Sequence, residues 1–116
     1  MFDSTGAPAP TPLPIAVVTT VATRAEARAM ATALVSRRLA ACVQISEIES
    51  VYSWQDTLHD EAEFRLVVKT IAASYAAVEA AIRELHPYEL PAIHAVAFAH
   101  VDGAYADWIA DGSSGR

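Results

Sequence analysis

The densest group of chemically active side chains lies in residues 86–91, whose sequence is His-Pro-Tyr-Glu-Leu-Pro. Because proline fixes the backbone φ angle, the two prolines would hold the imidazole of His86, the phenol of Tyr88 and the carboxylate of Glu89 in defined places on a loop. His86 and Glu89 could then serve as an acid–base pair, or as ligands of a copper-like divalent ion. The simpler interpretation is a stiff polar connection between a helix and a strand.

Three other side chains could contribute to a binding site. Tyr52 and Trp54 lie two residues apart and would share one face of a strand, where they could line a pocket or pack in a core or an interface. Lys69, the only lysine, could pair with a carboxylate such as Glu63 or Glu89, or remain solvated on its strand.

The remaining histidines offer no ready metal site. His59, His94 and His100 form no pair four residues apart on a helix, and His94 and His100 would lie roughly 20 Å apart on an extended strand. Any metal site must therefore be sparse, be built between subunits, or be formed with the loop carboxylate Glu89.

The composition excludes several classes of function. The chain of 116 residues has one cysteine, Cys42, which rules out an intrachain disulfide and a zinc site built from several cysteines, and which favours a reducing, cytoplasmic compartment. Its four glycines cannot form a phosphate-binding loop or a dinucleotide fingerprint, so no nucleotide is expected. The net charge of −6, without a basic window, argues against nucleic acid, and no apolar run is long enough to suggest a membrane partner.

Turn signals and periodicity divide the chain into three parts. Residues 1–14 hold four of the six prolines and are expected to form a disordered leader. Residues 15–110 are expected to form one folded domain, and residues 111–116 a flexible tail.

Within the domain, the apolar pattern alternates between the periods of strands and helices. Strands are expected at 15–20, 42–54, 61–69 and 93–101, with a bulge near 46–47 and a polar hairpin connection over 55–60. Helices are expected after capping signals at Thr23 and Ser74, and a short one after Asp102. This order predicts an α+β fold, a ferredoxin-like βαββαβ antiparallel sheet with helices on one face plus a short C-terminal helix.

The second face of the predicted sheet is unusual. The first and last strands are apolar at both odd and even positions, although the helices can cover only one face. Because no second domain is available in 116 residues, we expect further copies of the chain to cover the other face.

Five segments, taken in order along the chain, resemble the CutA divalent-cation tolerance family. They are Ala-Ala-Cys-Val at 40–43, Ser-Val-Tyr-Ser-Trp at 50–54, Leu-Val-Val-Lys-Thr at 66–70, His-Pro-Tyr-Glu-Leu-Pro at 86–91 and Tyr-Ala-Asp-Trp at 105–108. The resemblance covers the chain from about residue 15 to residue 109.

The resemblance implies a homotrimer of ferredoxin-like subunits that acts in tolerance to divalent metals, with Cu(II) or another divalent cation as ligand and no catalytic activity. It places a metal near His86 and Glu89. It also implies clefts between subunits, lined by Tyr52, Trp54, Glu63, Lys69, His86, Tyr88 and Glu89. The sequence departs from some members of the family at three positions, where Thr19 replaces a cysteine, Leu85 a histidine and Ala92 a carboxylate.

Three other functions are open at this point. The chain could be a trimeric regulatory module resembling the PII signalling proteins, which would bind a small ligand or a partner protein in clefts between subunits. It could be an enzyme that uses His86 and Glu89 as acid and base. It could also be a scaffold whose assembly anchors a partner.

Overall fold

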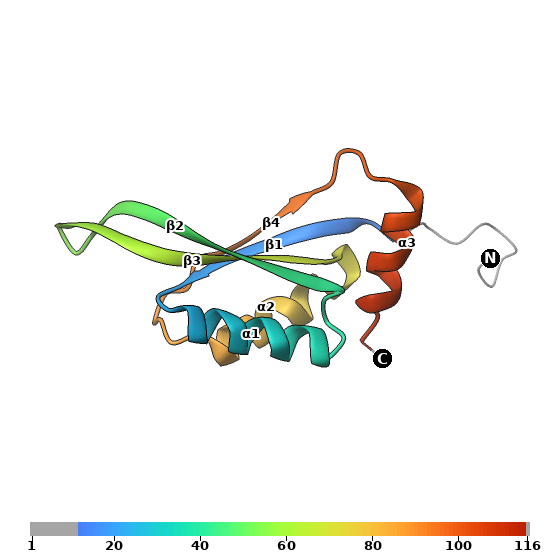
Figure 1. Ribbon diagram of the computed structural model, residues 1–116, viewed down its shortest axis with the longest axis horizontal. Coiled ribbons are helices and arrows are strands. Elements are labelled where there is room, and N and C mark those ends of the chain that lie inside the picture. Colours follow the sequence, from blue (N-terminus) through green and yellow to red (C-terminus); the bar gives the residue numbers. More distant parts are fainter. Residues whose placement is uncertain (1–11, 116) are drawn as a thin grey trace, which may run out of the picture.

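The computed structural model describes residues 12–115. Its elements in chain order are β1 (Pro14–Val21), α1 (Arg24–Ser36), β2 (Cys42–Trp54), β3 (Thr57–Ile71), a 3-10 turn (Ala72–Ser74), α2 (Tyr75–Leu85), β4 (Ile93–Ala97) and α3 (Gly103–Gly112). The strands form one antiparallel sheet in the order β2-β3-β1-β4, which is the ferredoxin-like order (Figure 1). The predicted fold class is therefore confirmed.

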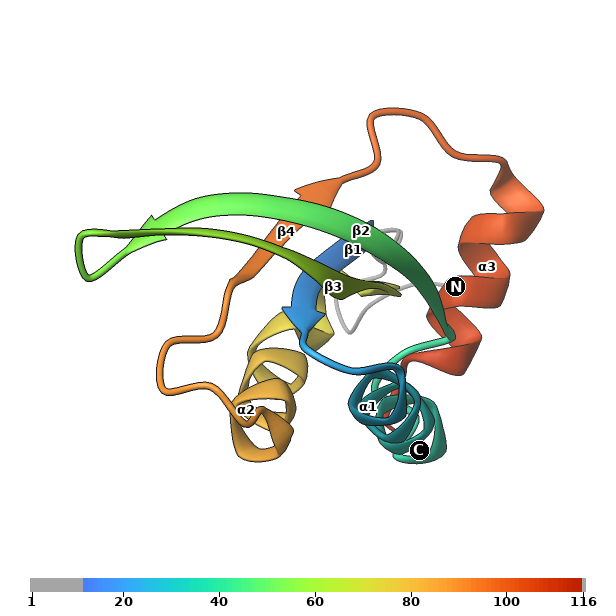
Figure 2. The same cartoon turned by 60° about the vertical axis from the view of Figure 1, so that its left-hand side comes forward.

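The core lies between the sheet and two helices. α1 and α2 run side by side beneath one face of the sheet, and α3 stands at one end (Figure 2). Alternate strand residues point into this layer, as the period-two pattern predicted. Side chains that are fully buried there include Val17, Leu66 and Val68 from the sheet and Leu34, Val78 and Ile82 from the helices.

The helix starts agree with the capping signals at two of three places. Thr23 Oγ1 accepts the backbone N–H of Glu26 at 3.1 Å, and Asp102 caps α3 through the N–H of Tyr105. Ser74 precedes α2 but makes no capping bond, because its own backbone is already helical rather than extended. Its hydroxyl donates to the carbonyl of Ser113 at 2.8 Å. This bond ties the start of α2 to the end of α3.

β2 and β3 form a long hairpin that differs from the predicted one in two ways. Its register runs without interruption from Cys42 opposite Lys69 to Trp54 opposite Thr57, so the bulge expected near residues 46–47 is absent. The connection is two residues long instead of six. Gln55 and Asp56 both have positive φ angles, as a type I′ turn requires, and this tight turn lets β3 begin at Thr57.

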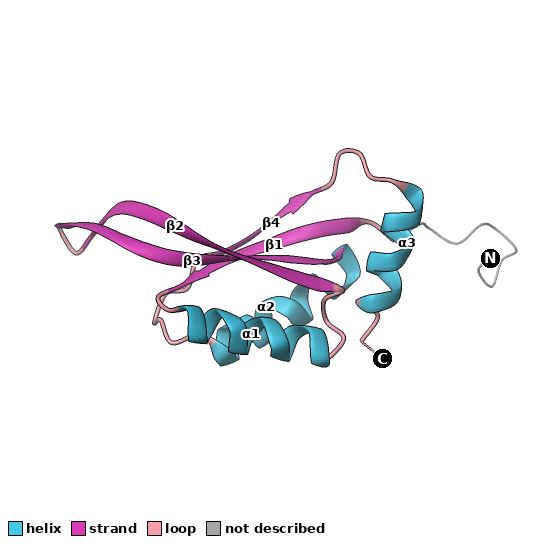
Figure 3. Ribbon diagram, viewed as in Figure 1, coloured by secondary structure: helices cyan, strands magenta, loops and turns pink. Residues whose placement is uncertain are grey.

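The two ends of the domain also differ from the expected boundaries. Residues 1–11 of the predicted leader lie outside the described residues, and Pro14 is already the first residue of β1. β4 ends at Ala97, earlier than expected, and the chain then loops over to α3 (Figure 3). At the other end α3 reaches Gly112 and Ser113 is fully buried, so the fold extends past residue 110 into the predicted tail.

The face of the sheet opposite α1 and α2 is partly open. The register places Ala16 and Val18 of β1, Val67 of β3 and Val96 of β4 on this face, which we call the open face. Val96 is 54% exposed and the other three are half-buried in the single chain. A row of aliphatic side chains thus remains in contact with solvent.

Candidate functional site

A cavity of about 490 Å³ lies between the β2–β3 hairpin and the loop that joins α2 to β4. This volume is within the usual range for small-molecule sites. Strand residues and loop residues line it on opposite sides. The strands contribute Thr20, Tyr52, Trp54, Glu61 and Glu63, and the loop contributes Tyr88, Glu89, Leu90 and Ala92.

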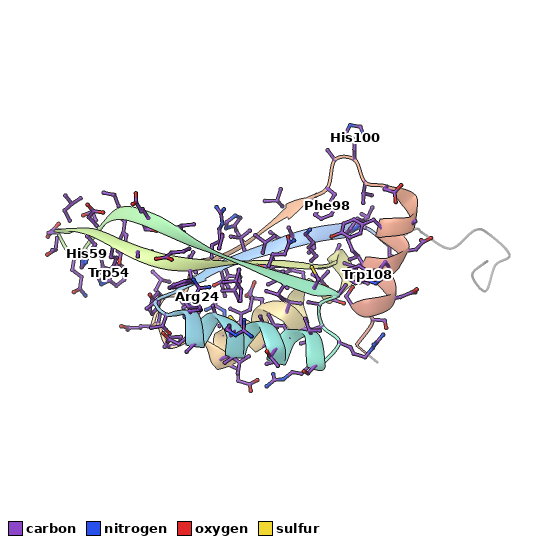
Figure 4. All side chains as sticks on the ribbon, viewed as in Figure 1. Arg24, Trp54, His59, Phe98, His100 and Trp108 are labelled. Carbon is purple, nitrogen blue, oxygen red and sulfur yellow. The ribbon has the colours of Figure 1, made fainter. Side chains whose placement is uncertain are left out.

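The strand side of the cavity follows from the hairpin register. Tyr52 and Trp54 on β2 share a face with Glu61 and Glu63 on β3, because directly opposed residues of antiparallel strands point to the same side. Figure 4 places Trp54 on the part of the hairpin that projects beyond the helices, together with His59. His59 stacks on Tyr52, with 5.0 Å between the ring centroids.

The loop side of the cavity is held in place by His86. Helix α2 ends before Pro87, where His86 takes an extended conformation. His86 Nε2 donates to the carbonyl oxygen of Thr20 at 2.8 Å, and Nδ1 accepts the backbone N–H of Tyr88 at 3.1 Å. A carbonyl can only accept and an amide N–H can only donate, so these partners assign the neutral tautomer with its proton on Nε2. His86, which is 9% exposed, therefore attaches the loop to the end of β1.

Carboxylates and burial raise the pKa of both phenols in the cavity. The hydroxyl of Tyr52 donates to the carboxylate of Glu61, which, together with desolvation and the charge of Glu63, raises the pKa of Tyr52 to about 12. Desolvation, followed by the charges of Glu63 and Glu61, raises the pKa of Tyr88. The lining holds three carboxylates and no lysine or arginine.

Glu63 is the most unusual member of this lining. The residue is only 8% exposed, and among residues 12–115 its carboxylate has neither a hydrogen bond nor an ion pair, while its oxygens keep contact with solvent in the cavity. A buried carboxylate is normally compensated by a donor or a cation. The cavity therefore contains an acidic group for which the described part of the chain supplies no partner.

Of the seven predicted site residues, five line the cavity, His86 lies behind the loop and Lys69 lies elsewhere. The structure brings Tyr52, Trp54, Glu63, Tyr88 and Glu89 to one cavity, with His86 behind the loop. The sequence interpretation overlooked four lining residues, Thr20, Glu61, Leu90 and Ala92. Glu61 could have been predicted, because it lies two residues from Glu63 on the same strand and therefore points to the same face.

Lys69 does not join this site. Its ammonium group donates to the hydroxyl of Tyr105 at 2.9 Å and lies 5.3 Å from the centroid of that ring, so within one chain it pairs with neither Glu63 nor Glu89. The bond with Tyr105 raises the pKa of Lys69. Tyr105 in turn stacks on Trp108 of α3, with 5.9 Å between centroids. Lys69 thus helps to attach α3 to the sheet.

The other candidate ligands are dispersed. Cys42 is half-buried at the start of β2, opposite Lys69, and His100 lies on the loop between β4 and α3, far from His59 (Figure 4). No group of three or more His, Cys, Asp or Glu side chains within residues 12–115 is arranged to hold a metal ion. No helix in this part of the chain is long and apolar enough to cross a membrane.

Comparison with known proteins gives a consistent result. The family of CutA1 divalent ion tolerance proteins matches residues 15–112. A probable divalent-cation tolerance protein of Encephalitozoon cuniculi, described as a cutA homolog, is 40% identical over 76 residues, which cover 66% of this chain and 67% of the relative.

Solved structures extend the similarity to the whole fold. A divalent cation tolerance protein from Thermus thermophilus superposes with a TM-score of 0.83 at 35% identity, over 87% of this chain and 99% of that one. A protein from Archaeoglobus fulgidus, described as a periplasmic divalent cation tolerance protein, superposes with a TM-score of 0.84 at 29% identity over the same shares.

Proposed function

Because this chain belongs to the CutA1 divalent ion tolerance family, we propose that it acts in tolerance to divalent cations by binding them as cargo, as a homotrimer and without catalysis. The observation that carries this proposal is the charge of the cavity, where Glu61, Glu63 and Glu89 meet with no basic side chain in the lining. Three carboxylates around one depression create a negative potential that attracts cations.

The proposed contact for the ion is the carboxylate of Glu89 on the loop. His86 was expected to be its fellow ligand, yet both imidazole nitrogens already make hydrogen bonds. Coordination by His86 would require one of these bonds to break. We therefore assign His86 the task of positioning Glu89. Since a single chain provides no complete ligand set among its described residues, further ligands would come from neighbouring copies or from water.

A calorimetric titration of the purified protein with Cu(II), Zn(II) and Mn(II) tests this proposal. Cu(II) is suggested by the family resemblance, whereas oxygen ligands suit Mn(II) better, so the order of affinities is informative. We expect saturable binding of at least one ion, and Glu89→Gln should weaken it by about tenfold, because one charged ligand is lost.

Glu49→Gln is the matched control, since Glu49 is an exposed carboxylate on β2 outside the cavity and its replacement makes the same change in charge. It should leave the affinity within about twofold of wild type. Absence of saturable binding, or equal effects of the two substitutions, would contradict the proposed cargo.

The open face supports the trimer. Its aliphatic row from Ala16 to Val96 resembles an interface core more than a solvated surface. Light scattering should give a mass three times the 12.4 kDa of the chain. Val96→Asp should shift the mass toward that of one chain, whereas Val35→Asp, at an exposed position on α1, should not. A single-chain mass for the wild type would rule out the trimer.

The cytoplasm remains the proposed compartment. The relative from Archaeoglobus fulgidus is described as periplasmic, so fractionation of the native host is the deciding measurement.

A second candidate function is a regulatory module that binds a small organic ligand. The rings of Tyr52, Trp54 and Tyr88 in the cavity lining favour it, because a hydrated metal ion would not use these aromatic walls.

A further inference from the structure

The cavity between the hairpin and the α2–β4 loop combines two features that point to one class of ligand. The first is Glu63, which is more than nine-tenths buried, lines the cavity and has no partner among the described residues. Its carboxylate lacks an opposite charge within the described chain, and a cation bound in the cavity would supply one at close range.

The second feature is the aromatic wall. Tyr52 and Trp54 line the cavity from the hairpin, and Tyr88 lines it from the loop. The faces of such rings carry negative potential and attract cations that shed their water readily. Alkylated ammonium groups do so, because their charge is spread over a surface that is largely apolar. A small divalent ion keeps its water and its oxygen ligands instead.

The size and the charge of the cavity agree with this chemistry. Its volume of about 490 Å³ is much larger than a single ion needs and suits a small organic molecule. Leu90 and Ala92 add apolar surface on the loop side. Because the lining contains no lysine or arginine, an anionic ligand would find no opposite charge within it.

We propose that this cavity binds a small organic cation with an ammonium head, which pairs with Glu63 and lies against the rings of Tyr52, Trp54 and Tyr88. This inference rests on the second candidate function and is tested separately from divalent-cation binding, which is proposed for the same cavity. The ring of Tyr52, fixed by its bond to Glu61 and by stacking on His59, forms a preorganised wall. Preorganisation of this kind lowers the entropic cost of binding.

The test is a calorimetric titration of the intact wild-type protein in buffer containing EDTA, so that divalent ions play no part. The probes are choline and ethanolamine, which present quaternary and primary ammonium heads, and 3,3-dimethylbutan-1-ol, the neutral isostere of choline. We expect saturable binding of at least one ammonium probe. The neutral alcohol should bind about tenfold more weakly or worse, since it cannot pair with a carboxylate.

Glu63→Gln keeps the shape of the side chain and removes its charge. It should lower the affinity for the ammonium probe by about tenfold. Glu49→Gln, outside the cavity, is again the matched control. If Glu63→Gln does not fold, Trp54→Leu at a position that is 44% exposed tests the aromatic wall instead and should weaken binding about fivefold.

The proposal is overturned if neither ammonium probe saturates, if the neutral alcohol binds equally well, or if the cavity substitutions leave the affinity unchanged. Because EDTA is present throughout, failure here is distinguishable from failure of the metal titration. Metal binding without ammonium binding would leave the divalent-cation proposal intact and overturn this one.

Discussion

His86→Ala is expected to lower the free energy of unfolding by about 2–4 kcal/mol, because it leaves two polar groups without partners. The carbonyl oxygen of Thr20 loses its donor and the N–H of Tyr88 loses its acceptor, in a place where the imidazole itself is 9% exposed. Urea unfolding of the variant and the wild type at equal protein concentration measures the difference.

His100→Ala is the control for this prediction. His100 is exposed on the loop between β4 and α3, so its replacement should change the free energy of unfolding by less than about 0.5 kcal/mol. An equally small effect of His86→Ala would show that the loop is anchored by something else, and would return His86 to the set of available metal ligands.

Gly112→Ala should also be strongly destabilising, by about 1–3 kcal/mol, because the added methyl group would overpack a closed contact. A Cβ atom at this position would lie 2.8 Å from the Cβ and 2.9 Å from the Cα of Ala41. The obstacle includes backbone, so α3 would have to move away from the start of β2. Urea unfolding again provides the measurement.

Gly103→Ala makes the same chemical change at the other end of the same helix. No atom lies within 4 Å of a Cβ built there, so this variant should match the wild type or gain up to about 1 kcal/mol from helix propensity. Comparable losses in the two variants would mean that α3 does not dock on Ala41 as described.

The sequence predicted the architecture well because most of it depends on local signals. The period-two alternation of Leu66 and Val68 and the capping pair Thr23 and Glu26 each reflect interactions within a few residues. The errors arose where tertiary contacts decide. Ser74 looks like a cap, yet it ends a 3-10 turn with a helical backbone, and its hydroxyl donates to the carbonyl of Ser113, which lies 39 residues away.

The hairpin shows a different limit of sequence reading. Its apolar residues change parity along β2, which suggested a bulge, but the register is continuous. The parity changes because the helices cover only the base of the hairpin, so Val43 and Ile45 face the core whereas Tyr52 and Trp54 face the cavity. A change of environment along one regular strand can therefore imitate a change of backbone geometry.

The candidate site was predicted in part. The two prolines around Tyr88 and Glu89 correctly indicated a fixed polar loop, and Tyr52 and Trp54 were correctly grouped on one face. The role of His86 could not be predicted, because it depends on the carbonyl of Thr20, 66 residues away. The bond of Lys69 could not be predicted for the same reason, since its partner Tyr105 belongs to a helix packed against the far end of the sheet.

The length of the hairpin has a consequence for how the molecule opens. Only residues 64–71 of β3 also pair with β1, so residues 57–63 are bonded to β2 alone and form a two-stranded arm. A two-stranded ribbon is marginally stable by itself, so its amide hydrogens would exchange with solvent when the two strands separate locally. The amide hydrogens at the base of the hairpin would exchange only through global unfolding. If neighbouring copies cover this arm in the assembly, its exchange slows to that of the core. The exchange rates of the amides in the arm would then show whether the subunits are assembled.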